Sequence, residues 1–188
     1  MPHYYPRHLE NFDYIGMHRY SLTFCTEDRA IRFKAAAVVE LVHAQILRAA
    51  IEQGFEITVY CYMPDHLHLL VRGTYEGAEG LTFISRAKQY SGFHYKERFK
   101  HRLWQRYGYE HVVRDDIEEA AIIRYIIDNP VRKGLVERAA DYPFTGSQRY
   151  TMAELEQLAI PSDETKFQRR LAEEPLVPAD AGNYKGSG

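Results

Sequence analysis

Two apolar, strand-like runs joined by a short turn constrain the fold of this chain more than any other segment. Residues 55–62 are rich in β-branched and aromatic residues, and residues 66–72 are apolar apart from two histidines and an arginine. Pro64-Asp65 lies between the runs, and this pair is typical of a tight turn. The pattern therefore predicts a β-hairpin over residues 55–72.

Strand and helix patterns continue on both sides of the hairpin. Alternation places Tyr20, Leu22 and Phe24 on one face of a first strand. Residues 26–28 offer capping side chains to a long helix, and Gly54 is expected to end it. In chain order, the predicted elements are a strand (14–25), a helix (30–53), two strands (55–62 and 66–72), a helix (81–96), an extended segment within 104–114 and a helix (117–128) opened by Asp115-Asp116 and ended by Asn129-Pro130.

This order matches the split βαβ ferredoxin-like arrangement with one added C-terminal helix. We therefore predict an α+β fold with an antiparallel sheet and helices packed on one face. The chain divides into a domain over residues 1–150 and a mildly acidic tail over residues 151–188. Short helices are expected in the tail at 152–158 and 163–173, and the Pro-, Ala- and Gly-rich end from Pro175 is expected to be disordered.

The composition is that of an ordinary soluble globular protein, with 45% hydrophobic and 27% charged residues. No run approaches the roughly 18 apolar residues that a membrane-spanning helix needs. Residues 1–7 lack the apolar core of a signal peptide, so we expect a cytoplasmic protein. Cys25 and Cys61 lie in apolar runs without Cys-x-x-Cys spacing, which favours buried thiols over a disulfide.

The net charge of −2 hides a strongly basic segment. Between Arg86 and Arg106 there are seven Lys and Arg residues against Glu97 alone, and five aromatic residues are interleaved with them. Cations that meet phosphates and rings that stack on bases suit a nucleic acid. The same pattern also fits a solvated helix face whose aromatic residues point to the core, so the segment leaves both interpretations open.

His66 and His68 are separated by one apolar residue in the second strand of the predicted hairpin. Strand side chains alternate, so both imidazoles point one way while Leu67 and Leu69 face the opposite, buried side. Two neutral nitrogen ligands side by side can hold a divalent metal ion. Because such a pair also occurs often by chance, the site needs further residues to become specific.

Tyr125 and Asn129 supply those residues. They stand at positions i and i+4 of a predicted helix, so a phenol and a carboxamide project from one face. Asn129 can add an oxygen ligand to the two histidines and leave open positions for phosphate oxygens, which suits Mg²⁺ or Mn²⁺. Taken singly, Tyr125 could be a packing residue and Asn129 a helix stop.

Three separated motifs carry a resemblance to a known family. They are Met63-Pro64-Asp65-His66-Leu67-His68, Leu103-Trp104-Gln105 and the run from Tyr125 through Asn129-Pro130 to Leu135. With them the chain resembles the single-tyrosine HUH transposases, and within these the REP-associated tyrosine transposases, over about residues 14–150. By position, His66 and His68 match the metal-binding histidines of the family. Tyr125 matches its nucleophile, and Asn129 matches its third metal ligand.

The resemblance implies a metal-dependent endonuclease and strand transferase with a transposase domain over residues 1–150. Tyr125 would attack single-stranded hairpin DNA, such as a repetitive extragenic palindrome, and form a 5′-phosphotyrosine while releasing a 3′-hydroxyl. The cofactor would be Mg²⁺ or Mn²⁺, and the protein would act on DNA in the cytoplasm as a monomer or homodimer. Candidate DNA-binding residues are Arg86, Lys88, Tyr90, Lys96, Arg102, Trp104, Gln105 and Arg114.

Three other functions remain to be weighed against this one. A ferredoxin-like module could bind hairpin DNA or RNA without cutting it, with the histidines as sheet residues. A relaxase or replication initiator commonly has its tyrosine ahead of the histidines, and Tyr125 lies after them, which disfavours that class. A hydrolytic zinc enzyme is weaker still, since no acidic general base accompanies the pair at HExxH-like spacing.

Overall fold

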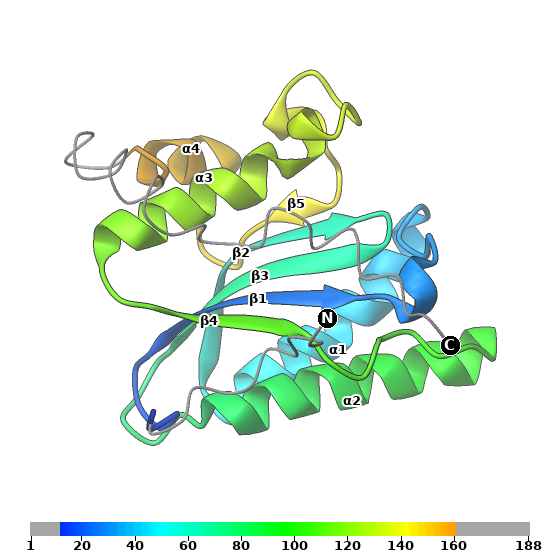
Figure 1. The fold of residues 1–188 in the computed structure, drawn as a ribbon, viewed down its shortest axis with the longest axis horizontal. Helices are drawn as coiled ribbons and strands as arrows, with labels where there is room; N and C mark the ends of the chain where they lie inside the picture. The colour runs from blue at the N-terminus through cyan, green and yellow to red at the C-terminus, as the bar shows by residue number, and fades with distance from the viewer. Residues whose placement is uncertain (1–11, 161–188) are drawn as a thin grey trace, which may run out of the picture.

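An antiparallel sheet of five strands organises residues 12–160, the part of the chain that the structure, a computed structural model, describes (Figure 1). The strands lie in the order β4-β1-β3-β2-β5. This topology confirms the predicted α+β, ferredoxin-like arrangement. The elements are β1 (Arg19–Cys25), the 3-10 turn η1 (Glu27–Arg29), α1 (Ala36–Gln53), β2 (Phe55–Met63), β3 (His66–Gly73), α2 (Gly80–Phe99), β4 (Tyr109–Val113), α3 (Asp116–Arg132), the 3-10 turn η2 (Ala139–Asp141), β5 (Thr145–Gly146) and α4 (Met152–Leu158).

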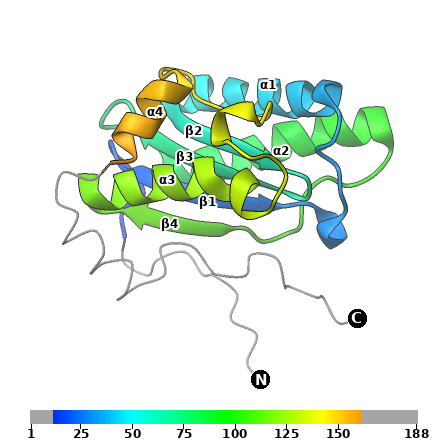
Figure 2. The same cartoon turned by 90° about the horizontal axis from the view of Figure 1, so that it is seen from above.

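Helices cover both faces of the sheet. α1 and α2 lie on one face and α3 and α4 on the other, and Figure 2 views the molecule from the α3 side. Helices had been expected on one face only, and α3 and α4 correct this. Four isoleucines of α3 are at most 3% exposed, and they pack with Val59, Cys61 and Met63 of β2. Burying these two apolar surfaces against each other stabilises the second layer.

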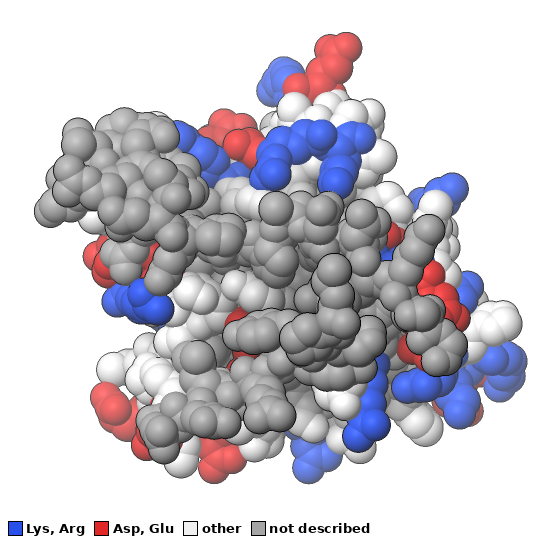
Figure 3. Space-filling model, in the orientation of Figure 1, with Lys and Arg blue, Asp and Glu red and all other residues white. Residues whose placement is uncertain are grey.

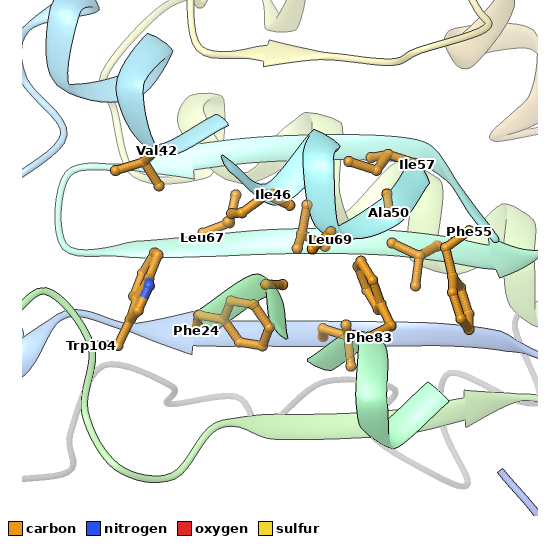
Figure 4. Close-up of a cluster of buried hydrophobic side chains, with 14 of the residues drawn as sticks. Phe24, Val42, Ile46, Ala50, Phe55, Ile57, Leu67, Leu69, Phe83 and Trp104 are labelled. Carbon is orange, nitrogen blue, oxygen red and sulfur yellow. The ribbon is translucent and has the colours of Figure 1, made fainter. Parts of the chain in front are cut away.

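The larger core lies between the sheet and the pair α1 and α2 (Figure 4). Phe24 of β1 and Leu67 and Leu69 of β3 point into it, at every second position of their strands. Each fully buried side chain of this size stabilises the fold by about 1.5–3 kcal/mol relative to an exposed one. The predicted alternation is therefore confirmed, and it places Thr23, His66 and His68 on the other face, where Leu70 packs with the α3 cluster.

The start of α1 differs from the prediction, since the helix begins at Ala36 rather than at residue 30. The Thr26 hydroxyl does not cap a helix. Its oxygen lies 2.7 Å from the carbonyl oxygen of Ala30 and 2.9 Å from that of Asp65. Phe33 is 1% exposed and packs against Tyr62, so burial holds this segment in a non-helical path. Tertiary contacts thus override the local helix pattern.

The helix α3 begins as predicted but ends one turn later. The Asp115 side chain accepts a hydrogen bond of 2.9 Å from the backbone N–H of Glu118, as an N-cap does. Asn129-Pro130 had been expected to end the helix, yet it continues to Arg132. Pro130 cannot donate to the Ile126 carbonyl, and only two residues of the helix follow it.

The segment after β5 is partly described. The predicted short helix at 152–158 is confirmed as α4, and Leu155 is fully buried in the same cluster as the α3 isoleucines. The predicted helix at 163–173 and the end from Pro175 lie outside the described residues, and the domain boundary at residue 150 stays a prediction. Both cysteines are free thiols. Cys61 is buried as expected, whereas Cys25 is only half-buried, which corrects the prediction for that residue. Within residues 12–160, no helix is both long and apolar enough to cross a membrane.

Candidate active site

The two histidines lie side by side on the α3 face of the sheet. In the register of the sheet, His68 pairs with Thr23 of β1 and His66 pairs with Cys25. The Nε2 atoms of the two imidazoles are 3.0 Å apart, and the rings meet edge to face with centroids at 4.6 Å. His66 is 6% exposed and His68 is 2% exposed. Two ring nitrogens therefore converge on one point in a buried setting.

The second nitrogen of each imidazole has a partner of its own. His66 Nδ1 lies 2.7 Å from a carboxylate oxygen of Asp65, so this nitrogen carries the proton and donates it. His68 Nδ1 lies 3.0 Å from the Thr23 hydroxyl, which can donate or accept. Metal-binding histidines usually have such outer partners, which fix the ring and leave the other nitrogen for the ion.

Burial favours the neutral form of both imidazoles. It lowers the pKa of His66, although the Asp65 carboxylate opposes this, and it lowers the pKa of His68 well below the usual value. Nearby cations act in the same direction: Arg29 on both rings, Lys133 on His66 and Arg132 on His68. Burial by itself would raise the pKa of Asp65, but the hydrogen bond from His66 and the charge of Arg29 lower it. The site therefore holds two neutral nitrogen ligands beside an ionised carboxylate.

Tyr125 of α3 lies against this pair. Its ring and that of His68 meet edge to face, with centroids 5.5 Å apart. The guanidinium of Arg132, two turns further along α3, lies over the phenol ring at 4.8 Å from its centroid. The ring is half-buried. Helix α3 thus delivers the predicted nucleophile to the predicted metal ligands within one chain.

Asn129 lies one turn beyond Tyr125 and is 3% exposed. Its amide nitrogen donates a hydrogen bond of 2.9 Å to the Tyr125 carbonyl, which orients the carboxamide and leaves its oxygen as the atom that can bind a cation. Among residues 12–160, no three or more His, Cys, Asp and Glu side chains gather as a metal site. The assignment of Asn129 as the third ligand stays a prediction.

The distance between the two histidine nitrogens fits a divalent ion. Two ligand atoms at right angles, each about 2.1 Å from one octahedral ion, lie about 3.0 Å apart. The two Nε2 atoms are separated by 3.0 Å. Neutral nitrogens with partnered Nδ1 atoms and a buried amide oxygen form a donor set that Mn²⁺ or Mg²⁺ accepts. The residues present are therefore compatible with the expected cofactor.

Most of the candidate DNA-binding residues lie on or after α2, on the opposite side of the sheet from the histidines. Arg86, Lys96, Arg102 and Arg114 are exposed. Gln105 is half-buried, and its backbone N–H donates to the Cys25 carbonyl at 2.9 Å. None of these residues joins the histidines and Tyr125.

Three other candidates are already engaged within the protein. The Lys88 ammonium donates to the carbonyls of Gln105 and Arg106 at 2.8 and 3.0 Å, and burial lowers its pKa to about 8. The Tyr90 hydroxyl donates to Glu52 at 2.8 Å. Trp104 is 6% exposed and its indole donates to Ser91 at 2.9 Å. A buried indole offers no face to a base, so Trp104 is a core residue rather than a stacking surface.

The structure adds site residues that the sequence had not singled out. Thr23, Arg29 and Asp65 contact the site from β1, η1 and the hairpin turn, and Arg132 and Lys133 reach it from the end of α3. Figure 3 shows Lys and Arg side chains gathered over this end of α3. Only the placement of Asp65 beside His66, and of Arg132-Lys133 after Asn129, could have suggested these residues.

Comparison with known proteins gives a family match and two curated relatives. The family model described as Transposase IS200 like matches residues 15–129. A Haemophilus influenzae protein, provisionally named a REP-associated tyrosine transposase, is 34% identical over 116 residues, or 54% of this chain and 64% of that protein. The REP-associated tyrosine transposase of Escherichia coli K12 is 26% identical over 133 residues, or 68% of this chain and 76% of that protein. The chain thus spans less than two thirds of the H. influenzae relative.

A solved structure has the same fold. It is described as a REP-associated tyrosine transposase bound to a REP hairpin, and it matches with a TM-score of 0.67 and 19% identity. The match covers 84% of this chain and 93% of the other. At this level of identity the likeness concerns the arrangement of strands and helices.

Proposed function

The chain belongs to the IS200-like transposase family, and from this premise we propose that it cleaves and rejoins single-stranded DNA with Tyr125 as the nucleophile. The predicted resemblance to the REP-associated tyrosine transposases is confirmed by both curated relatives. One observation carries the proposal: the Tyr125 ring lies 5.5 Å from that of His68, whose Nε2 is 3.0 Å from that of His66. A tyrosine that served only in packing would not require two converging histidine nitrogens beside it.

The proposed substrate is hairpin DNA with single-stranded flanks. The solved structure with the same fold is described as bound to a REP hairpin, and this supports the same class of ligand here. Arg132 and Lys133, both exposed at the end of α3, place positive charge beside Tyr125, where a phosphate would have to lie. A phosphodiester backbone therefore suits the charge of this surface.

In the proposed reaction the Tyr125 oxygen attacks the phosphorus of one phosphodiester. The tyrosine hydroxyl loses its proton, the bond from phosphorus to the 3′ oxygen breaks, and that oxygen gains a proton. A 5′-phosphotyrosine and a free 3′-hydroxyl result, and attack by another 3′-hydroxyl reverses the step and joins strands. A Mg²⁺ or Mn²⁺ ion held by His66, His68 and Asn129 would supply charge stabilisation at the phosphate. Arg132 holds the phenol against His68 and adds positive charge there.

The proposal is tested by covalent capture. The protein is incubated with Mn²⁺ and a pool of DNA hairpins whose single-stranded flanks are random in sequence, and adducts are resolved on a denaturing gel. We expect an adduct that disappears in Tyr125→Phe and persists in Tyr75→Phe, a matched change at an exposed tyrosine in the loop after β3. Hairpin binding without any adduct across the whole pool would instead support a binding module that does not cut.

We further propose that one chain forms a complete site, because Tyr125 and His68 of the same chain are in contact. Mixing Tyr125→Phe with His68→Ala tests this. Two subunits that exchange α3 would regain adduct formation in the mixture, whereas a site formed within one chain stays inactive. Light scattering with hairpin DNA present then decides between a monomer and a homodimer.

A further inference from the structure

We infer that Arg29 and Asp65 form a positioning relay that fixes His66 as a metal ligand. The inference rests on the proposed function, because it concerns the same metal site. Neither residue is a candidate metal ligand. They act through His66: Asp65 selects which ring nitrogen faces His68, and Arg29 holds Asp65 in place.

The first link of the relay joins Asp65 to His66. One carboxylate oxygen, Oδ1, lies 2.7 Å from His66 Nδ1. A guanidinium nitrogen of Arg29, which can only donate, lies 3.4 Å from the same Nδ1, but the carboxylate is the closer partner. A carboxylate can only accept a hydrogen bond, so this nitrogen carries the proton and Nε2 presents its lone pair. Asp65 follows Pro64 in the tight turn between β2 and β3, so its backbone is fixed by the hairpin itself. The turn thus sets the tautomer of the histidine that follows it.

The second link joins Arg29 to Asp65. Nε of Arg29 lies 3.0 Å from Oδ2, the carboxylate oxygen that does not contact His66. A second guanidinium nitrogen, Nη1, is 2.8 Å from Cys25 Sγ. The side chains of Arg29 and Asp65 are 14% and 26% exposed, so water screens this ion pair only in part. The guanidinium of Arg29 therefore pairs with the carboxylate and also approaches the imidazole, since Nη2 lies 3.4 Å from His66 Nδ1.

The backbone around Arg29 supports a role at the site. Asp28 and Arg29 have φ angles of 54° and 53°, in the left-handed region that residues other than glycine seldom adopt. Backbone strain of this kind costs about 1–3 kcal/mol per residue and is concentrated at functional sites.

Backbone hydrogen bonds hold this strained turn against the hairpin. The Thr26 N–H donates to the Asp65 carbonyl at 3.0 Å, and the N–H groups of Arg32 and Phe33 donate to the Pro64 carbonyl at 2.8 and 3.0 Å. The segment that carries Arg29 therefore wraps around the turn that carries Asp65. This docking explains why Arg29 meets Asp65 although 36 residues separate them in the chain.

His68 offers the contrast that makes the relay specific. Its Nδ1 partner is the Thr23 hydroxyl at 3.0 Å, which can donate or accept. The tautomer of His68 is thus free to change when an ion binds, whereas Asp65 holds His66 in one form. The two proposed ligands therefore differ: the tautomer of His66 is fixed before an ion binds, whereas that of His68 is not.

The test begins with the wild-type protein free of metal. Two-bond nitrogen–proton NMR spectra of ¹⁵N-histidine at about pH 7.5 report the tautomer of each ring. We expect His66 to carry its proton on Nδ1. A proton on Nε2 of His66 would overturn the inference without any variant being made.

Metal affinity supplies the second readout, measured by calorimetry with Mn²⁺ alone. We expect Asp65→Ala to weaken binding by about 10–100-fold, the usual effect of losing an outer partner of a ligand. Asp65→Asn should recover part of the loss, since its amide oxygen can still accept from His66. Arg29→Gln should weaken binding by several-fold. The matched control is Arg48→Gln, which removes the same charge from an exposed ion pair on α1.

The outcomes separate this inference from the proposed function. Wild-type protein that binds no Mn²⁺ would count against the metal site itself. If wild-type protein binds Mn²⁺ and forms the Tyr125 adduct, but Asp65→Ala and Arg29→Gln bind Mn²⁺ as tightly as Arg48→Gln, then the site stands and the relay is wrong. Thermal unfolding without metal verifies that each variant is folded.

Discussion

The two faces of the sheet use the same strands for opposite purposes. On the α1 and α2 face, Leu67 and Leu69 of β3 are fully buried in the apolar core. On the α3 face, His66 and His68 of the same strand are also buried, yet they contact Asp65, Thr23 and Tyr125. Alternation along β3 therefore places leucines in the core of one face and the histidines in the polar site of the other, where Leu70 packs with the α3 cluster.

The contrast between the two faces shows how a small domain can bury a polar site. The α3 face buries its histidines with hydrogen-bond partners, because a buried polar group without one is costly. The larger core on the α1 and α2 face and the isoleucine cluster of α3 supply the stability that the polar site does not provide. Changes on the two faces should thus separate cleanly into losses of activity and losses of stability.

The largest expected effect is on activity and lies on the α3 face. His68→Ala should reduce formation of the Tyr125 adduct by at least about a thousandfold, because the cation that stabilises charge at the phosphate is lost. Hairpin affinity should change little, since the basic surface is untouched. Gel capture and fluorescence anisotropy measure the two quantities. If this variant still cleaved DNA, a metal ion held by His66 and His68 would not be needed for the reaction.

The next effect is on stability and lies on the α1 and α2 face. Leu69→Ala, one position along the same strand, should lower the free energy of unfolding by about 2–5 kcal/mol through the cavity that it leaves. Urea denaturation measures this loss. Adduct formation per folded molecule should stay near that of the wild type. A selective loss of activity in Leu69→Ala would show that the two faces are not independent.

The response to acid compares histidines from the two faces. Burial lowers the pKa of His43 on α1 to about 4 and also lowers those of His66 and His68. Between about pH 6.5 and 4 these histidines bind protons in the unfolded chain but not in the folded one. The free energy of unfolding is therefore highest above this window and falls as the pH falls. Each histidine can contribute up to about 1.4 kcal/mol per pH unit.

Urea denaturation of metal-free protein at several pH values, with His43→Gln and His68→Gln, assigns the pH slope to the two faces. Each variant should flatten the slope in this window. If neither does, the buried histidines are not the source of acid sensitivity.

The smallest expected effect concerns DNA affinity. Hairpin binding should weaken steeply with salt, because cations that meet phosphates displace counterions. Arg132→Gln, at the end of α3, should reduce the slope of log affinity against log salt by about 0.7–0.9, one phosphate contact. Arg86→Gln, on α2, makes the equivalent change on the other side of the sheet. If Arg86→Gln changed the salt slope more than Arg132→Gln did, the DNA would bind on the α2 side of the sheet instead.

Features that depend on local periodicity could be predicted from the sequence. Strand geometry places His66 and His68 on one face and the two leucines between and after them on the other. Helix geometry places Tyr125 and Asn129, at positions i and i+4, on one face of α3. The order of elements predicted the ferredoxin-like sheet, but not that α3 and α4 cover its second face.

Features that depend on tertiary contacts could not be predicted. Burial of Phe33 moved the start of α1 to Ala36, and burial of Trp104 removed a candidate stacking surface. The approach of Arg29 to Asp65 needs a left-handed turn docked on the hairpin, for which no sequence pattern exists. Which face of the sheet α3 covers likewise depends on the apolar residues of β2 that α1 and α2 leave uncovered.

The central claim is that Tyr125 becomes linked to DNA when a divalent ion is present. Peptide mapping by mass spectrometry of adducts formed with Mn²⁺ tests it most directly, because the chain contains 15 tyrosines. We expect a single modified peptide, with Tyr125 joined to a 5′-phosphate and a free 3′-hydroxyl on the released strand. Linkage through another residue, or through a 3′-phosphate, would contradict it.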